Sequence, residues 1–195
     1  MYWIIAVLVL LAFDVNYYVR FICTQLSLNI SNLVHKKQLT DTVTSYGICT
    51  TQDIDIFLDH MNNVRFLREL DFARYHWFGR TNFWSKLRSR GASSVQGATS
   101  IRYRRMIGLF RPFRVETRLV WWDERSLYLE HRFVTLTDGF VRAVAISRQV
   151  APGRFNMGEL IEQFDECRVK PERPEEIGHW LEAIEVSSLK LRKER

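Results

Sequence analysis

Residues 62–84 read NNVRFLRELDFARYHWFGRTNFW and carry the strongest helical pattern in the chain. Apolar residues recur there every three or four positions with charged residues between them, as in a helix that buries one face. The apolar positions are Val64, Phe66, Leu67, Leu70, Phe72, Ala73 and Trp77. This spacing predicts one long internal helix, which we expect Gly91 to interrupt.

Runs rich in β-branched and aromatic residues flank the helix and predict five strands. One run precedes the helix and four follow it, at residues 42–50, 93–107, 110–122, 127–136 and 140–150. The last four are joined by short connections, so we expect neighbours in sequence to pair as antiparallel hairpins. Several of them alternate polar and apolar residues, as in Tyr128-Leu129-Glu130, which predicts one buried and one exposed face.

These elements together predict an α+β domain. A strand, a long helix and four strands require an antiparallel sheet to cover the apolar side of that helix, which would lie in the sheet's concavity. Residues 175–194 follow as an amphipathic C-terminal helix that ends in the basic run LKLRKER. We expect this arrangement to form a single core.

The composition is that of an ordinary globular protein with one domain. The chain has 195 residues, of which 47% are hydrophobic and 26% charged. Cys23, Cys49 and Cys167 are odd in number and form no CxxC pair, so we predict neither a disulfide framework nor a zinc site. The net charge of +6 favours anionic partners, such as phospholipid surfaces, nucleic acid or the phosphates of a cofactor.

The chain begins with an apolar segment. Residues 2–13 read YWIIAVLVLLAF and a second apolar run reaches Ile22, so about 21 residues could span the ~30 Å of a bilayer. Neither a basic residue before Tyr2 nor an A-x-A cleavage motif is present, which favours an uncleaved anchor over a secretory signal. Positive charge follows at Arg20 and Lys36, so the positive-inside tendency places the rest of the chain in the cytosol.

Carboxylates, a histidine and two asparagines gather directly before the long helix. Residues 53–74 read DIDIFLDHMNNVRFLRELDFAR and resemble the active-site signature of hot-dog thioesterases of the 4-hydroxybenzoyl-CoA thioesterase type. The matching positions are Asp53, Asp55, His60, Met61, Asn62, Asn63, Phe66, Asp71, Ala73 and Arg74. This sequence departs from the family pattern twice: four residues separate Asp55 from His60 where three are usual, and Phe66 replaces the commoner tyrosine. The resemblance covers nearly the whole chain.

Thioester hydrolysis needs a base or nucleophile and a donor for the developing oxyanion. Asp55 could be the base or nucleophile, and His60 could polarise water or orient that carboxylate. Asn62, with amides at the helix N-terminus, could hold the thioester oxygen. A purely structural interpretation stays open, in which Asp59 and Asn62 are helix caps and His60 is a buried, hydrogen-bonded histidine.

The resemblance implies a hot-dog fold, in which an antiparallel sheet wraps one long central helix, with an N-terminal hydrophobic helix and a C-terminal helix. It implies an acyl-CoA thioesterase acting on fatty-acyl thioesters, with no metal and no cofactor. It also implies a homodimer with sheets joined edge to edge, in which each site borrows residues from its partner. The implied catalytic residues are Asp55, His60, Asn62 and Asp71, and Asn63 and Phe66 would contact the substrate.

We therefore divide the chain into an anchor and juxtamembrane linker, residues 1–37, and a thioesterase-like domain, residues 38–195. We expect the domain to face the cytosol at the endoplasmic reticulum membrane, with secretion after signal cleavage as the alternative. A catalytically inactive acyl-binding protein is the second hypothesis, which the extra residue before His60 favours. The five arginines of residues 101–114 suit a solvated strand face better than nucleic acid, which we do not expect as a partner.

Overall fold

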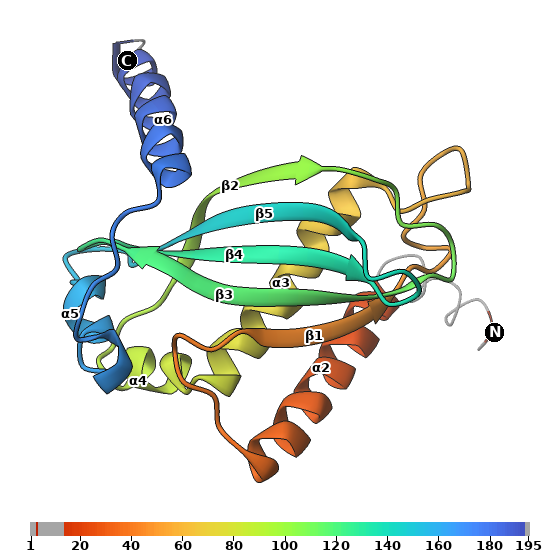
Figure 1. The fold of residues 1–195 in the computed structure, drawn as a ribbon, viewed down its shortest axis with the longest axis horizontal. Coiled ribbons are helices and arrows are strands. Elements are labelled where there is room, and N and C mark those ends of the chain that lie inside the picture. Colours follow the sequence, from red (N-terminus) through yellow and green to blue (C-terminus); the bar gives the residue numbers. More distant parts are fainter. Residues whose placement is uncertain (1–2, 4–13, 194–195) are drawn as a thin grey trace.

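The computed structural model describes Trp3 and residues 14–193 of the chain, arranged as a curved sheet wrapped around a helix (Figure 1). The sheet is antiparallel and its strand order is β1-β3-β4-β5-β2. The strands are β1 (Val43–Ile48), β2 (Val95–Tyr103), β3 (Pro112–Trp122), β4 (Ser126–Thr135) and β5 (Val141–Val150). The predicted α+β class and all five strands are confirmed.

The α-helices lie around this sheet. They are α2 (Val15–Val34), α3 (Asn63–Arg80), α4 (Phe83–Ser89), α5 (Met157–Ile161) and α6 (Glu175–Lys193), and a short 3₁₀ helix covers Asp165–Cys167. The central helix α3 crosses the concave face of the sheet (Figure 1). Phe66, Leu70 and Ala73 on α3 form one buried cluster with Phe113 and Phe133 on the strands.

The expectation that Gly91 ends the central helix is wrong. Helix α3 ends at Arg80, and the following Asn82 has a φ of 57°, in the left-handed region. An asparagine tolerates this conformation better than most residues, and it redirects the chain into the separate helix α4. Gly91, with a φ of 68°, instead follows the end of α4.

The expectation that β2 and β3 form a hairpin is also wrong. Strand β2 pairs with β5 at one edge of the sheet, whereas β3 lies between β1 and β4. The residues between β2 and β3 cross the end of the sheet and bind the segment before α3. The Met61 amide donates to the Ile107 carbonyl at 2.8 Å, and His60 forms a bridge with Gly108. These contacts hold the connection open, so it is not a tight turn.

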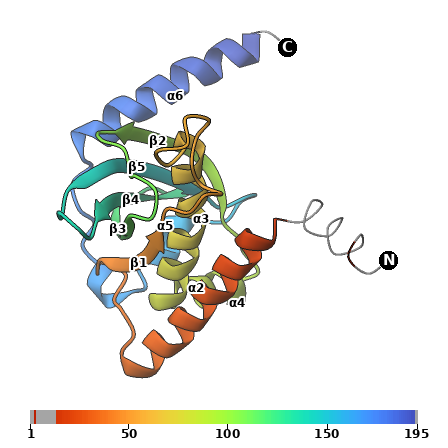
Figure 2. The ribbon, with the colours of Figure 1, turned by 90° about the vertical axis from the view of Figure 1, so that its right-hand side faces the viewer.

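The face of β4 that carries Leu127, Leu129 and Phe133 is buried, whereas its other face is buried at Tyr128, half-buried at Glu130 and exposed at Arg132. Its concave side packs toward α3, and the first turns of α6 cover part of its other side. There Ile177 and Trp180 of α6 pack with Trp121, Tyr128 and Ile146. The rest of α6 projects away from the sheet (Figures 1 and 2).

The N-terminal helix α2 packs beside α3, as the rotated view shows (Figure 2). Leu28 of α2 lies directly over Gly79, where an added Cβ would come within 2.4 Å of a leucine methyl group. The Arg68 guanidinium of α3 forms an ion pair at 2.6 Å with Asp14, and Arg20 forms an ion pair with Glu69. Helix α2 is therefore joined to the domain by both apolar and ionic contacts.

Within the described part of the chain, no helix is both long enough and apolar enough to cross a membrane. The predicted anchor, Tyr2–Ile22, lies mostly outside the described residues. Its last eight residues, 15–22, form the first turns of α2.

Candidate functional site

The motif loop, residues 53–62, enters helix α3 at the end of the sheet. A bridge between Ile54 and Met61 closes its base, and the Asp55 amide donates to the His60 carbonyl at 3.0 Å. Leu58 at its tip has a φ of 62°, a left-handed conformation that is uncommon for leucine. The loop is thus a tight projection that brings Asp55 and His60 face to face.

The structure brings together Asp55 and His60, as the sequence predicts. The His60 Nε2 atom lies 3.5 Å from the Asp55 carboxylate, and the adjacent Asp59 carboxylate contacts His60 Nδ1. Asp55 and His60 are half-buried, whereas Asp59 is exposed. The Asp55 carboxylate also accepts a hydrogen bond from the Phe57 amide at 3.1 Å. A carboxylate held beside an imidazole can act as a base or nucleophile whose orientation the ring controls.

Asn62 is the N-cap of α3. Its side-chain oxygen accepts a hydrogen bond from the Val64 amide at 2.9 Å, which is the usual role of asparagine at this position. The side-chain NH₂ group is a separate donor and remains suited to a substrate oxygen. Capping and oxygen binding are therefore compatible at Asn62.

Asp53 has a structural role in the motif loop. Its side chain is buried and accepts hydrogen bonds from the Thr50 amide at 2.9 Å and the Thr50 hydroxyl at 2.7 Å. Its carbonyl accepts from the Asn62 amide at 2.8 Å, which ties the start of the loop to the helix N-terminus. The first carboxylate of the D-x-D motif fixes the loop, while Asp55, the second, stays accessible.

Glu69 and Asp71 both belong to α3, and the structure gives their carboxylates different surroundings. Glu69 is only 4% exposed and pairs with Arg20 of α2. Burial raises the pKa of the Glu69 carboxyl to about 7, although Arg20 opposes this shift. The sequence interpretation favoured Asp71 as a catalytic residue and did not foresee this buried pair.

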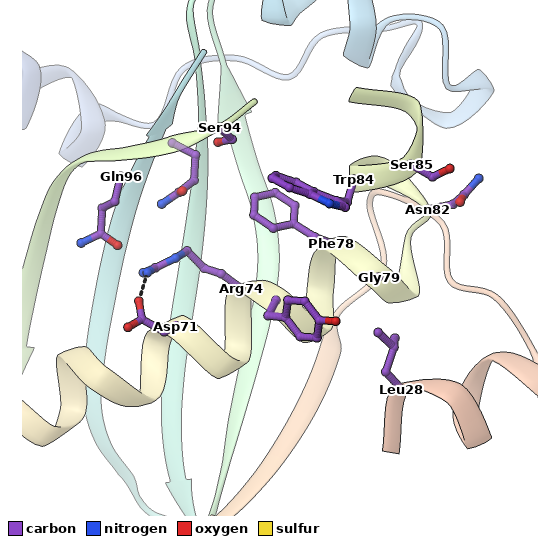
Figure 3. A pocket seen from close by; sticks show the side chains of 12 residues that line it. Leu28, Asp71, Arg74, Phe78, Gly79, Asn82, Trp84, Ser85, Ser94 and Gln96 are labelled. Atoms are coloured by element: carbon purple, nitrogen blue, oxygen red, sulfur yellow. Dashed lines mark hydrogen bonds and ion pairs between the residues drawn. The ribbon is translucent and has the colours of Figure 1, made fainter. Parts of the chain in front are cut away.

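Asp71 lies in a different place from Asp55 and His60. It lines a cavity of about 470 Å³ between α3, α4 and strands β2 and β5, where its carboxylate pairs with Arg74 (Figure 3). None of Asp55, His60 and Asn62 is among the residues that line this cavity. Within one chain, therefore, the fold does not gather all four predicted catalytic residues.

The two predicted substrate contacts occupy contrasting positions. Asn63 is the first residue of α3, and its carbonyl accepts a hydrogen bond from the Tyr103 hydroxyl at 2.9 Å. Phe66 is buried, with its ring centroid 5.0 Å from that of Phe133 and 5.3 Å from that of Tyr103. Phe66 therefore packs beneath the motif loop, within the core.

Asp55, Asp59 and His60 have ligand atoms that all lie within 4.8 Å of one another. Oxygen and imidazole nitrogen are suitable ligands for several divalent metals. Partly exposed acidic groups of this kind are common at protein surfaces without any metal, so we assign no metal to them.

Comparison with known proteins defines the class. The family profile of the thioesterase-like superfamily matches residues 49–181, which include the motif loop, α3 and strands β2 to β5. The chain therefore belongs to the thioesterase-like superfamily, and its fold is the hot-dog fold. Helix α2 precedes the matched region, and most of α6 follows it.

The curated relatives are more specific. Protein THEM6 of Drosophila melanogaster is 47% identical over 196 residues, which cover 100% of both chains. Protein THEM6 of Xenopus laevis is 40% identical over 182 residues, covering 93% of this chain and 86% of the relative. This chain is thus similar to the thioesterase superfamily member 6 proteins along almost its entire length, α2 included.

Solved structures support the fold alone, because their sequence identities are low. The Escherichia coli protein YbaW, described as a probable thioesterase, superimposes with a TM-score of 0.56 at 20% identity, covering 62% of this chain and 97% of its own. The BH1999 gentisyl-coenzyme A thioesterase gives a TM-score of 0.54 at 15% identity, covering 63% and 99%. SAV2348 of Staphylococcus aureus, solved in complex with CoA, gives 0.54 at 14% identity, covering 74% and 96%.

Proposed function

We propose that this protein is an acyl-CoA thioesterase that hydrolyses fatty-acyl thioesters at a membrane. The observation that carries the proposal is the Asp55 carboxylate held 3.5 Å from His60 at the N-terminus of the central helix of a hot-dog domain. Membership of the thioesterase-like superfamily supports the reaction class, and the CoA complex of SAV2348 supports CoA as the carrier.

The residues of the motif loop divide the reaction between them. Asp55 attacks the thioester carbonyl or activates a water molecule, and His60 orients the Asp55 carboxylate. The Asn62 amide donates to the carbonyl oxygen as negative charge develops on it, aided by the partial positive charge at the helix N-terminus. If Asp55 attacks, the CoA thiolate leaves and a water molecule then cleaves the resulting anhydride between Asp55 and the acyl group; if Asp55 activates water, that water adds to the carbonyl directly and the thiolate leaves. In both routes the thiolate takes up a proton released by the water, and the acyl group departs as a carboxylate that carries the water oxygen.

A homodimer would bring Asp71 into this scheme. Strand β2 lies at one edge of the sheet and most of its residues are exposed, whereas the other edge strand, β1, contacts α3 and lies beside α2. An unpaired strand edge can add a strand from another chain. Pairing of two β2 strands would join the sheets edge to edge, and we propose that it places Asp71 of one subunit near the motif loop of the other.

The N-terminal segment is the proposed membrane attachment. Helix α2, which follows the apolar residues 2–13, leaves a row of apolar side chains exposed, namely Tyr18, Val19, Ile22, Leu26, Ile30 and Leu33. Exposed apolar patches of this kind mark interaction surfaces. We propose the endoplasmic reticulum, with the domain facing the cytosol, and protease protection in intact microsomes tests this orientation. Protection of the domain would contradict it and favour the lumen.

Free-thiol release from a panel of acyl-CoA chain lengths tests the proposed activity. The full-length protein is required, because removal of residues 1–36 would also remove Arg20 and leave Glu69 buried without its partner. We expect Asp55→Asn and His60→Ala each to lower kcat by at least about 100-fold. Asp165→Asn is the matched control, because Asp165 is exposed and lies in the 3₁₀ helix, outside the motif loop.

A catalytically inactive acyl-binding protein is the second candidate. One observation favours it: the Asp59 carboxylate contacts the second ring nitrogen of His60. Saturable acyl-CoA binding without thiol release at any chain length would select this candidate. Release that persists in both the Asp55 and His60 variants would contradict the assignment of these residues.

A further inference from the structure

The cavity that contains Asp71 carries a second set of polar groups, distinct from the motif loop. It has a volume of about 470 Å³ and lies between the C-terminal half of α3 and the β2–β5 edge of the sheet. Phe78 and Trp84 form its aromatic end, with ring centroids 5.8 Å apart (Figure 3). Gln96 and Gln149, which are cross-strand partners on β2 and β5, line it from the sheet.

Three buried polar atoms in this lining have no hydrogen-bond partner among the described residues. They are Arg74 Nη1, Ser94 Oγ and Gln149 Nε2. Arg74 is 9% exposed and Gln149 is 2% exposed, so little water reaches either side chain. A guanidinium has only donors, and the Gln149 NH₂ group is also a donor. A buried donor without an acceptor is unfavourable, so a rotation of these side chains toward an acceptor oxygen in the adjoining cavity would be stabilising.

The charges around these donors restrict the kind of oxygen. The Asp71 carboxylate pairs with Arg74 through Nη2, so the two side chains largely neutralise each other. A carboxylate or phosphate in the cavity would meet the negative charge of Asp71 as well as the positive charge of Arg74. A neutral carbonyl or hydroxyl oxygen gains the hydrogen bonds without that repulsion.

We propose that this cavity binds an apolar group that carries one neutral acceptor oxygen, held by Arg74 and Gln149 and flanked by Phe78 and Trp84. The identity of the natural ligand rests on the proposed function. The ligand is then the acyl part of a thioester with an oxo or hydroxyl substituent, and Gln149 and Arg74 determine specificity for it. A volume of about 470 Å³ is within the range of small-molecule sites.

Benzophenone and diphenylmethane test the proposal, because they share two phenyl rings and differ in one carbonyl oxygen. Full-length protein is irradiated with increasing benzophenone, which cross-links to nearby C–H groups, and the labelled peptides are identified by mass spectrometry. We expect labels in residues 74–85 or 94–96. We expect the half-saturating benzophenone concentration to rise about tenfold in Gln149→Leu and to stay unchanged in Gln52→Leu, a control at an exposed residue outside the cavity.

Diphenylmethane serves as an unlabelled competitor in the same assay. It lacks the oxygen, so we expect its half-protecting concentration to be equal in the wild-type protein and Gln149→Leu. Ser94→Ala, a smaller change in the same lining, repeats the comparison. Labels confined to sites outside the cavity would overturn the proposal. It would also be overturned if neither Gln149→Leu nor Ser94→Ala weakened the binding of benzophenone more than that of diphenylmethane.

The outcome is independent of thioester hydrolysis, because neither probe is a thioester. An active thioesterase that fails this test keeps its proposed function and loses the assigned specificity. An inactive protein that passes it keeps the cavity assignment and loses the proposed hydrolysis.

Discussion

The Asn62 side chain caps α3 through the Val64 amide and has a second, proposed role as a donor to the substrate, and two substitutions separate these roles. Asn62→Ala removes both the capping oxygen and the amide donor, so we expect it to lower the free energy of unfolding by about 1 kcal/mol and also to lower kcat. Asn62→Asp keeps an oxygen that can accept from the Val64 amide and removes the NH₂ donor. We therefore expect Asn62→Asp to unfold like the wild-type protein in urea yet lose kcat as Asn62→Ala does. Full activity in Asn62→Asp would show that Asn62 only caps the helix.

Glu69 makes the stability of the protein depend on pH. Burial raises its pKa from 4.5 to about 7, so between these values the folded protein holds a proton that the unfolded chain has released. The stabilisation is complete below about pH 4.5 and is lost as the pH rises to about 7. This shift corresponds to about 3 kcal/mol.

We expect the free energy of unfolding of the wild-type protein to fall by about 2.5 kcal/mol more than that of Glu69→Gln between pH 5 and pH 8. The uncharged glutamine has a similar shape and no proton to exchange in this range. Urea unfolding at several pH values measures both proteins. Parallel pH profiles would mean that Glu69 titrates normally in the folded protein.

At the scale of elements, the contact between α2 and α3 shows how a segment outside the thioesterase profile is joined to the domain. Arg20 of α2 reaches buried Glu69 and also lies 4.0 Å from Asp53, whose carbonyl holds the start of α3 through Asn62. One side chain thus links α2 to the central helix and to the base of the motif loop. Arg20 therefore connects helix α2 directly to the segment that forms the candidate site.

Arg20→Met tests this linkage at pH 8, where Glu69 is ionised. Removal of one partner of a buried ion pair leaves an uncompensated charge, so we expect the free energy of unfolding to fall by about 3 kcal/mol. The double variant Arg20→Met, Glu69→Met replaces both charges with apolar groups and should recover most of that loss. Urea unfolding of both variants measures the effect. A double variant that is no more stable than Arg20→Met would show that the two side chains act independently.

At the scale of the whole molecule, we expect a homodimer. The candidate residues of one chain lie in two places, with Asp55 and His60 in the motif loop and Asp71 in the cavity, and the open edge of β2 offers a surface for a second copy. Light scattering with chromatography on the full-length protein should give twice the chain mass of 23.2 kDa after correction for bound detergent. A monomer that retains thioesterase activity would contradict the need for a shared site.

Much of this architecture follows from local sequence patterns. Period-three and period-four spacing of apolar residues predicted the central helix, and β-branched runs predicted all five strands, because these patterns reflect backbone geometry over a few residues. These local patterns did not predict the pairing of β2 with β5. That pairing depends on the open connection between β2 and β3, which binds Met61 and His60, and these segments are more than forty residues apart in the chain.

The candidate site shows the same division. The sequence by itself determined that Asp55, His60 and Asn62 stand at the start of a helix, because eight consecutive residues and one turn place them together. Only the tertiary structure decided that Glu69 is buried against Arg20 and that Asp71 faces a separate cavity with Arg74 and Gln149. Burial, charge pairing and cavity lining depend on segments that are distant in the chain, so their energies exist only after the sheet has closed around α3.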